Sequence, residues 1–238
     1  MDIHGVGNIT ALSEEDPIGL ALEEEPFAAI EISARKQLRE AAVVCQCEPN
    51  AVLFREGEAS MTLWMLREGW VRLTKQVSGT ARPLTLDIVT PKDNLCGLSA
   101  FFDMPYMATA VAVAPVRAVC LPSESLRPLL ASSVTIASAV ARMLNGRYRH
   151  LAAVYATAFA SAETKITAAL ARLEEDFGSE IPITRREIAE MTGTAVETAI
   201  RITRKMERAG ILRLIRGEIV VVQSLLRRSR PPCRHYFE

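Results

Sequence analysis

Histidine is scarce in this sequence, and the common motifs of enzymes are missing. The 238 residues include 3 His, and we recognise no paired carboxylates, nucleophile motif or phosphate-binding loop among them. The 5 Cys contain no Cys-x2-Cys run, and their odd number does not resemble the disulfide framework of a secreted protein. We therefore expect no catalytic residues and no enzymatic activity. Free thiols, metal ligation and redox sensing remain open as roles for the cysteines.

Long hydrophobic runs are also missing. No apolar run approaches the roughly 18–20 residues that a membrane helix needs, and residues 1–20 are acidic where a secretory signal would be basic and then apolar. Hydrophobic residues make up 49% and charged residues 24% of the chain, as in ordinary globular proteins. We expect a cytoplasmic protein with no membrane partner, of a length that suits two domains.

The formal net charge of zero conceals an uneven distribution of charge. Residues 1–178 hold 16 Lys and Arg against 21 Asp and Glu, whereas residues 179–238 hold 12 against 7. A basic C-terminal region is typical of a protein that contacts nucleic acid with that end, although a solvated basic surface produces the same counts.

The hydrophobic pattern predicts an α+β fold. Residues 1–29 look like a loose acidic segment, and residues 30–44 like a short amphipathic helix that caps the next domain. Residues 51–121 alternate short β-branched runs with Gly, Pro and Asx turns, which predicts an antiparallel, jelly-roll-like β-roll. The predicted β-roll domain, with its helical cap, covers residues 30–121.

Residues 122–160 predict a long dimerisation helix. Its apolar positions alternate in spacings of four and three residues, as in a coiled coil, with Arg147 as the exception. No other helix of equal length is expected in the chain, so a twin helix from a second subunit is the economical partner. The alternative, a helix lying on its own β-roll, would need a broader apolar stripe. The predicted dimer interface is Val140, Leu144, Arg147, Leu151, Val154 and Ala158.

Residues 161–224 carry the pattern of a winged helix-turn-helix. Thr184 and Glu187 have the spacing of a capping box at the start of one helix, and Gly193 supplies a tight turn before a second helix. The following LRLIRGEIVV reads as strand, turn and strand, which makes a β-hairpin wing. In such a domain the N-terminal part of the second helix enters the major groove of DNA.

The second helix places Glu197 and Arg201 one turn apart on one face. A glutamate accepts a hydrogen bond from cytosine N4 and an arginine donates to guanine O6 and N7, so we interpret this pair as base readers. An isolated pair at this spacing is more commonly a surface ion pair. Thr184, Arg185 and Thr198 suit phosphates. The predicted DNA-binding residues are Thr184, Arg185, Arg186, Thr194, Ala195, Val196, Glu197, Thr198, Arg201, Arg204 and Lys205. Residues 225–238 are expected to be a mobile basic tail that contains Cys233 and adds only sequence-independent affinity for DNA.

These motifs resemble the CRP/FNR superfamily of transcription regulators. The resemblance covers about residues 51–222 and is strongest in ITRREIAEMTG, ETAIR and GILRLIRGEIVV. It implies a homodimer that binds a pseudo-palindromic operator in double-stranded DNA, contacts RNA polymerase and reads bases with Glu197 and Arg201. The family has an arginine at the position of Val196, which could instead touch a thymine methyl group.

The resemblance also implies an effector pocket in the β-roll. Relatives of the cyclic-AMP type hold the ribose with a glutamate where this chain has Leu98 and the phosphate with an arginine where it has Ala108. A cyclic phosphodiester without a cation would be an uncompensated buried charge, so we expect that the signal is not a cyclic nucleotide. The predicted pocket residues are Cys96, Gly97, Leu98, Ala108, Thr109, Arg147 and His150.

The cofactor remains open at this point. Relatives that sense carbon monoxide place a haem-ligating cysteine at the position of Cys96, so Cys96 and His150 are candidate metal ligands at an apolar pocket. The N-terminal cysteine cluster of the iron–sulfur branch is absent, which leaves only an unusual set drawn from Cys45, Cys47, Cys96 and Cys120.

Another small ligand, or none, also remains open. In a strand, Cys45 and Cys47 would face the same side, which suits a metal, a strained disulfide or two core positions. The alternative function is a haem or metal redox protein whose C-terminal domain serves assembly only.

Overall fold

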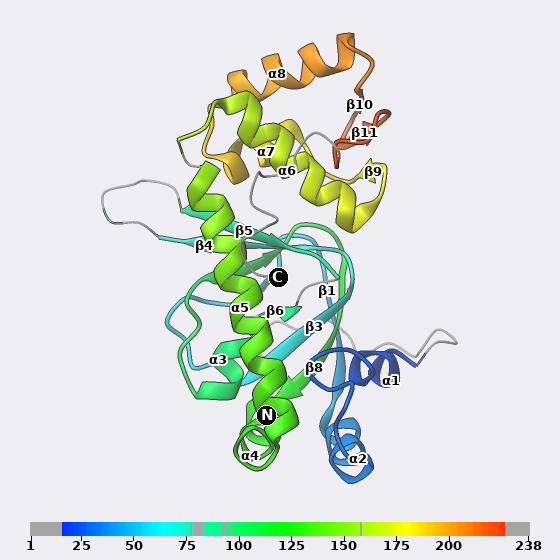
Figure 1. The fold of residues 1–238 in the computed structure, drawn as a ribbon, viewed down its shortest axis with the longest axis vertical. Coiled ribbons are helices and arrows are strands. Elements are labelled where there is room, and N and C mark those ends of the chain that lie inside the picture. The colour runs from blue at the N-terminus through cyan, green and yellow to red at the C-terminus, as the bar shows by residue number, and fades with distance from the viewer. Residues whose placement is uncertain are drawn as a thin grey trace, which may run out of the picture. The chain divides into compact units, whose positions relative to one another are not determined.

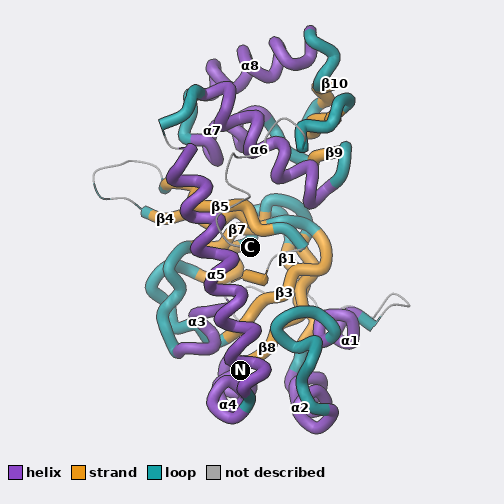
Figure 2. Tube along the Cα trace, viewed as in Figure 1, coloured by secondary structure: helices purple, strands orange, loops and turns teal. Residues whose placement is uncertain are grey.

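The computed structural model describes residues 16–76, 78, 83–91, 94–95, 97–157 and 159–226. The chain divides into two compact units, Met1–His150 and Leu151–Glu238, whose elements are labelled in Figure 1 and coloured by type in Figure 2. Helices and antiparallel sheets occur in both, so the predicted α+β class is confirmed.

The first unit is built on two four-stranded antiparallel sheets, which form the predicted β-roll. One sheet has the order β1–β8–β3–β6 and consists of β1 (Val43–Cys47), β8 (Val116–Pro122), β3 (Thr62–Glu68) and β6 (Asn94–Leu95). The other has the order β2–β7–β4–β5 and consists of β2 (Val52–Phe54), β7 (Thr109–Ala112), β4 (Val71–Lys75) and β5 (Leu84–Val89).

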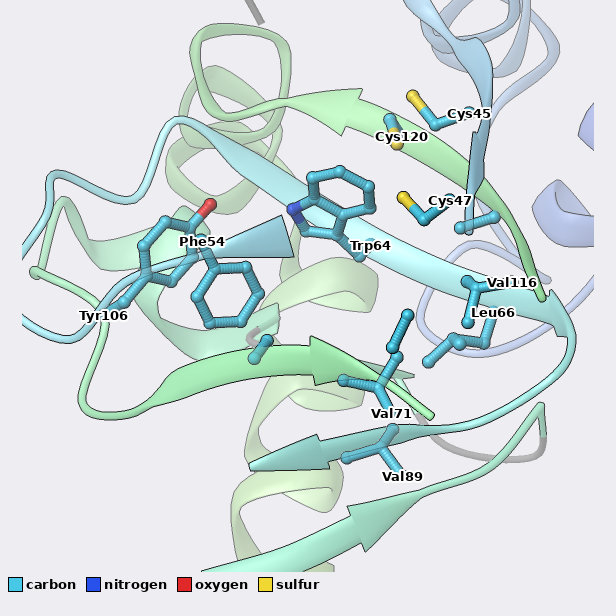
Figure 3. Close-up of a cluster of buried hydrophobic side chains, with 13 residues drawn as sticks. Cys45, Cys47, Phe54, Trp64, Leu66, Val71, Val89, Tyr106, Val116 and Cys120 are labelled. Atoms are coloured by element: carbon cyan, nitrogen blue, oxygen red, sulfur yellow. The ribbon is translucent and has the colours of Figure 1, made fainter. Parts of the chain in front are cut away.

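An apolar cluster, which we call the inner cluster, fills the space between the two sheets (Figure 3). Trp64 and Leu66 of β3 point into it, because alternate residues of a strand face the same side. The rings of Phe54 and Tyr106 stack there with centroids 3.8 Å apart. The inner cluster contains Cys45, Cys47, Phe54, Trp64, Leu66, Val71, Val89, Tyr106, Ala110, Ala112, Val116, Ala118 and Cys120.

A second apolar cluster, the outer cluster, covers the other face of the sheet that contains β3. Leu63 and Met65 of β3 point into it, between the inward residues of the same strand. Each fully buried side chain of this size contributes about 1.5–3 kcal/mol. The helices that complete the cluster are α1 (Pro17–Leu22), α2 (Ile32–Ala41), α3 (Gly97–Phe102), α4 (Ser123–Ser132) and the start of α5 (Val134–Thr157).

The N-terminal region differs from the prediction in two ways. The segment 16–29 is not loose, because Asp16 accepts a hydrogen bond from the Gly19 amide at 3.0 Å at the start of α1, and Phe27 is fully buried. The predicted helix over 30–44 is shorter, because β1 begins at Val43. Ile32, the first residue of α2, is 87% exposed, so this helix buries less apolar surface than an amphipathic helix over 30–44 implies.

The segment 122–160 forms two helices rather than one. Ser133 separates α4 from α5, its hydroxyl accepts from the Ile136 amide at 3.3 Å, and the two helices are bent by 109°. A serine that caps a new helix explains the break. Within the described ranges, no single helix is long and apolar enough to cross a membrane, and α4 with the start of α5 meets that condition only as this bent pair.

The turn from β3 to β4 depends on Gly69, which has a φ of +74°. A Cβ atom at this position would lie 2.1 Å from the carbonyl oxygen of Pro115. At Gly57, with a φ of +83°, an added Cβ would meet nothing within 4 Å. A side chain at Gly57 would therefore meet backbone strain alone, whereas one at Gly69 would meet both strain and a steric clash.

We expect Gly69→Ala to lower the free energy of unfolding by about 3 kcal/mol or more, because strain and clash add. Gly57→Ala should cost only the strain of a positive φ, about 1–2 kcal/mol. Urea unfolding followed by tryptophan fluorescence measures both, because the 2 Trp of the chain lie in this unit, at positions 64 and 70. Equal losses would contradict the role given to the Pro115 carbonyl.

Candidate nucleic-acid interface

The second unit is a helix-turn-helix followed by a β-hairpin, as predicted. It begins with α6 (Ala162–Phe177) and β9 (Glu180–Ile181), continues with α7 (Arg185–Thr192) and α8 (Val196–Arg208), and ends with β10 (Leu212–Ile215) and β11 (Glu218–Val221). The three strands form one sheet in the order β10–β11–β9. The β10–β11 hairpin is the wing.

Local hydrogen bonds determine where α7 begins and ends. Thr184 Oγ1 accepts from the Glu187 amide at 3.2 Å, and Glu187 Oε2 accepts from the Thr184 amide at 2.7 Å, so the predicted capping box is present. Gly193 ends the helix in the left-handed conformation, with φ 60° and ψ 34°. These two signals are local in the sequence, which is why the motif could be predicted.

One side of α8 is buried and the other is exposed. Ala199, Ile202 and Met206 form the buried side, together with Thr203, whose hydroxyl donates to the Ala199 carbonyl at 2.8 Å. This side packs against α6 and α7. The opposite side lines a hollow of about 360 Å³, whose lining residues are Glu197, Ile200, Arg201, Arg204 and Arg208.

Glu197 and Arg201 lie on that exposed side with their side chains unpaired. Both are exposed, and in the part of the chain that the structure describes neither side chain has a hydrogen-bond or ion-pair partner. The surface ion pair that was the alternative explanation for this spacing is therefore not formed. Their carboxylate and guanidinium groups are available to an external partner.

Three arginines meet at a second hollow, of about 420 Å³, where the start of α7, the end of α8 and the wing come together. Arg185 and Arg204 were predicted as DNA contacts, whereas Arg216, in the turn of the wing, was not. An arginine in the tight turn of a predicted wing is the signal that could have identified it. Three guanidinium groups around one hollow suit a phosphate.

Glu207 attaches the wing to α8. Its Oε1 accepts from the Leu214 amide at 3.0 Å, and Leu214 belongs to β10, the outer strand of the sheet. An amide on the free edge of a sheet would otherwise lack a partner within the domain. The carboxylate therefore orients the wing relative to α8.

Two of the predicted DNA-binding cations are engaged within the domain. Arg186 Nε donates to Glu190 at 3.3 Å, and Lys205 Nζ donates to both carboxylate oxygens of Glu163 on α6 at 2.8 and 2.9 Å. Their contacts with DNA stay predictions. The other predicted positions lie in the turn before α8 and in its first turn, and they are Thr194, Ala195, Val196 and Thr198.

The apolar row on α5 differs from the predicted one at its start. Val140 is 2% exposed and belongs to the outer cluster. Because its side chain is buried in the core of its own chain, its assignment to the dimer interface was wrong. Arg147 pairs with Asp87 of β5 at 3.3 Å, and so it contacts its own β-roll. The side chain of Val154 and all of Ala158 lie outside the described residues. The exposed row, which we call the α5 row, is Leu144, Tyr148, Leu151 and Tyr155.

Only part of the predicted effector pocket is described. Cys96 lies outside the described residues, and so do the side chains of Leu98 and His150, while Gly97 begins α3. Ala108 is buried. The Thr109 hydroxyl accepts from the Glu56 amide at 3.1 Å.

Lys75, a cation near this part of the roll, is already paired. Lys75 Nζ lies 2.6 Å from Glu56 Oε1 and 3.0 Å from the Met107 carbonyl, and the hydrogen bond that it donates holds the pKa of Glu56 below the ordinary value. Among the residues that the structure describes, no group of three or more His, Cys, Asp or Glu is arranged to hold a metal ion. Cys45, Cys47 and Cys120 are free thiols in the inner cluster.

Comparisons with known proteins agree with this architecture. The family model "Cyclic nucleotide-binding domain" matches residues 44–133, and the model "Crp-like helix-turn-helix domain" matches residues 164–225. The chain is 26% identical over 176 residues to the Cyclic AMP receptor protein of Thermus thermophilus, an alignment that covers 73% of this chain and 81% of that protein.

Solved structures share the same fold. FixK2 from Bradyrhizobium japonicum superposes with a TM-score of 0.69 at 19% identity, over 77% of this chain and 93% of that chain. The c-di-GMP responsive global regulator CLP of Xanthomonas campestris superposes with a TM-score of 0.64 at 16% identity, over 81% of this chain and 100% of that chain. With both domain models matched in order along one sequence, the chain belongs to the CRP/FNR family of DNA-binding transcription regulators.

Proposed function

We propose that this protein is a homodimeric regulator that reads a specific DNA sequence and responds to a signal other than a cyclic nucleotide. The observation that carries the proposal is the unpaired Glu197 and Arg201 on the exposed side of α8. A protein that used this domain for assembly alone would have no need of an unpaired glutamate and an unpaired arginine one helical turn apart. The DNA-binding function is therefore favoured over a redox protein.

Two kinds of DNA contact follow from the positions of the charged residues. Glu197 and Arg201 are suited to base edges, which carry sequence information, whereas the hollow lined by Arg185, Arg204 and Arg216 is suited to a phosphate. A two-fold dimer presents two such domains, so the operator is a pseudo-palindrome with half-sites about one helical turn apart. RNA polymerase is a further proposed partner, by family resemblance.

The α5 row supports dimerisation. Leu144, Tyr148, Leu151 and Tyr155 follow spacings of four, three and four residues, which is the heptad pattern of a coiled coil. The two tyrosines are each 71% exposed and Leu151 is 65% exposed in the single chain. A row of large apolar side chains in water is unfavourable, and a second copy of the same helix is the partner that matches its length and period.

Two features oppose a cyclic nucleotide as the signal. Ala108 stands where relatives of the cyclic-AMP type have the phosphate-binding arginine, and Lys75 is already paired with Glu56. Haem ligation by Cys96 and His150 stays a prediction, and the absorption spectrum of freshly purified protein tests it. The iron–sulfur alternative also stays a prediction, because Cys96, a member of its proposed ligand set, lies outside the described residues.

Base reading and phosphate binding should separate in binding experiments. We expect Arg201→Ala and Glu197→Ala each to lose about 1–3 kcal/mol of discrimination at one base pair of each half-site. Arg216→Ala should weaken binding to all duplexes alike and lower the salt slope by about one. Arg213→Ala is the matched control, because Arg213 is on the same wing but does not line the hollow.

These affinities can be measured by fluorescence anisotropy, with an operator selected from random duplexes and with its single base-pair variants. A uniform loss of affinity in Arg201→Ala, without a change in base preference, would contradict the base-reading role. Equal salt slopes for Arg213→Ala and Arg216→Ala would contradict the phosphate site.

The α5 row can be tested by introducing a charge. We expect Leu151→Glu to convert a dimer into a monomer of 26.1 kDa and to abolish operator binding, because two carboxylates would meet in the interface. Val134→Glu is the control, since Val134 is exposed at the start of the same helix but outside the row. Light scattering at micromolar concentration measures both. A mass of 26.1 kDa for the wild-type protein would contradict the proposed dimer.

The signal prediction can be tested by thermal unfolding. A ligand that binds only the folded state stabilises it by about 2.7 kcal/mol at 100 times its dissociation constant, which shifts the melting temperature visibly. We expect millimolar cyclic AMP and cyclic GMP to produce no shift, because the pocket position of Ala108 supplies no cation. A reproducible rise of several degrees with either nucleotide would overturn this prediction.

A further inference from the structure

Three thiols meet inside the β-roll, although they come from distant parts of the sequence. Cys45 and Cys47 alternate with the exposed Gln46 on β1, so both sulfurs face the inner cluster, and Cys120 reaches the same place from β8. All three residues are buried. Figure 3 shows the Cys120 side chain next to those of Cys45 and Cys47.

The register of the two strands singles out Cys45 and Cys120 as a pair. Val43 lies opposite Cys120, and Ala118 lies opposite Cys45, so the two cysteines are diagonal neighbours. Diagonal neighbours have Cα atoms about 7–8 Å apart, within reach of side-chain contact. Their thiols are in hydrogen-bond contact, whereas Cys47 lies opposite Val116, further along the strand.

This contact gives the three thiols different acidities. The hydrogen bond from Cys120 stabilises the thiolate of Cys45 and lowers the pKa of Cys45. Burial, and then the same hydrogen bond, raises the pKa of Cys120, while burial raises the pKa of Cys47 to about 11. Cys45 therefore ionises first, next to a thiol that stays protonated. A reactive thiolate beside a protonated thiol is the arrangement of a redox pair.

The surroundings favour a neutral product of the reaction. The side chains around the pair are apolar, and Trp64 lies opposite Cys120 on the neighbouring strand β3. A metal ion would need three or four ligands, and in the described part of the chain no group of three or more His, Cys, Asp or Glu is arranged to hold one. A disulfide carries no charge.

The position of β1 gives a small oxidant a route to Cys45. This strand lies at the edge of its sheet, and among the described strands it pairs with β8 alone. Edge strands open locally at a lower free energy than global unfolding requires. A hydroperoxide is small enough to enter during such an opening. Burial thus slows the reaction without preventing it.

We propose that Cys45 and Cys120 form a redox pair that a hydroperoxide converts into an intrachain disulfide between β1 and β8. The Cys45 thiolate attacks one peroxide oxygen, a sulfur–oxygen bond forms, the oxygen–oxygen bond breaks, and hydrogen peroxide releases hydroxide. The Cys120 sulfur then attacks the resulting sulfenic acid, a sulfur–sulfur bond forms, and the sulfenic oxygen leaves as hydroxide. Two protons, one from each thiol, complete two water molecules, so two thiols are oxidised as one peroxide is reduced.

Formation of the disulfide would move β1. Disulfide-linked residues have Cα atoms about 4.4–6.8 Å apart, which is closer than diagonal neighbours of an undistorted sheet. The bond would therefore draw the edge strand toward β8. A disulfide formed against such a displacement is more easily reduced by thiols, which suits a reversible signal. This proposal does not rest on DNA binding.

The test is peptide mapping of the full-length protein after treatment with hydrogen peroxide. Trypsin releases Cys45 and Cys47 together in residues 40–55 and Cys120 in residues 118–142. We expect a cross-linked peptide that joins these two segments and lacks two hydrogen atoms. Thiol reductant should convert it back to the separate peptides.

Variants assign the bond to one cysteine of β1. The cross-link should form in Cys47→Ala and be lost in Cys45→Ala and Cys120→Ala, with the rate of thiol loss reduced about tenfold in Cys45→Ala. Cys47→Ala is a matched control, because Cys47 shares the strand, the face and the burial of Cys45. Circular dichroism of each reduced variant identifies any that fail to fold.

Two results would overturn the proposal. One is a cross-link that persists in Cys45→Ala, which would assign the bond to Cys47. The other is a folded wild-type protein whose Cys45 and Cys120 both remain fully alkylable after peroxide treatment and unfolding. If one variant fails to fold, the wild-type cross-link and its behaviour in Cys47→Ala still decide between these outcomes.

Discussion

The sheet that contains β3 is apolar on both faces, and this constraint organises the first unit. Trp64 and Leu66 need cover on one side, and Leu63 and Met65 need it on the other. The sheet that contains β4 covers Trp64 and Leu66. Leu63 and Met65 are covered by helices that lie before and after the β-roll in the sequence, including the start of α5, where Val140 is buried. The first turns of α5 are thereby buried against the rest of the unit, and the exposed α5 row begins only at Leu144.

The apolar interior also limits the kind of ligand that the β-roll can hold. Its inner cluster consists of apolar side chains and three thiols, and the lysine beside it is neutralised by Glu56. An anionic ligand would find no unpaired cation among these residues. A signal that acts through chemistry on sulfur needs no such cation, because both the thiols and the disulfide are compatible with an apolar interior.

Local signals made the DNA-binding domain predictable from sequence. Its signals lie within ten residues of each other: the capping box of Thr184 and Glu187 marks the start of a helix, and Gly193 marks its end. The β-roll could also be predicted, because its turns punctuate short β-branched runs. The burial of Phe27 could not be predicted, since its short apolar stretch lies among acidic residues and depends on a surface made by distant strands.

Other features depend on which strands become neighbours, and a single sequence does not contain that information. Cys45 and Cys120 are brought together by the pairing of the first strand with the last strand of the roll. Arg216 joins Arg185 only when the wing folds back beside the start of α7. The heptad pattern found Leu144 and Leu151 correctly as exposed positions, but spacing alone could not show that Val140 was already used by its own core.

The hydrogen bond from the Leu214 amide to Glu207 has a consequence for the shape of the DNA that this protein accepts. Because it attaches the wing to α8, it fixes the position of the proposed phosphate site at Arg216 relative to the proposed base reader Arg201. The protein then fixes the distance between the DNA backbone and the base edge that it contacts, and cannot adapt this distance to the duplex. Duplexes whose groove width differs at this point pay a deformation energy, so base pairs that no side chain touches still influence affinity.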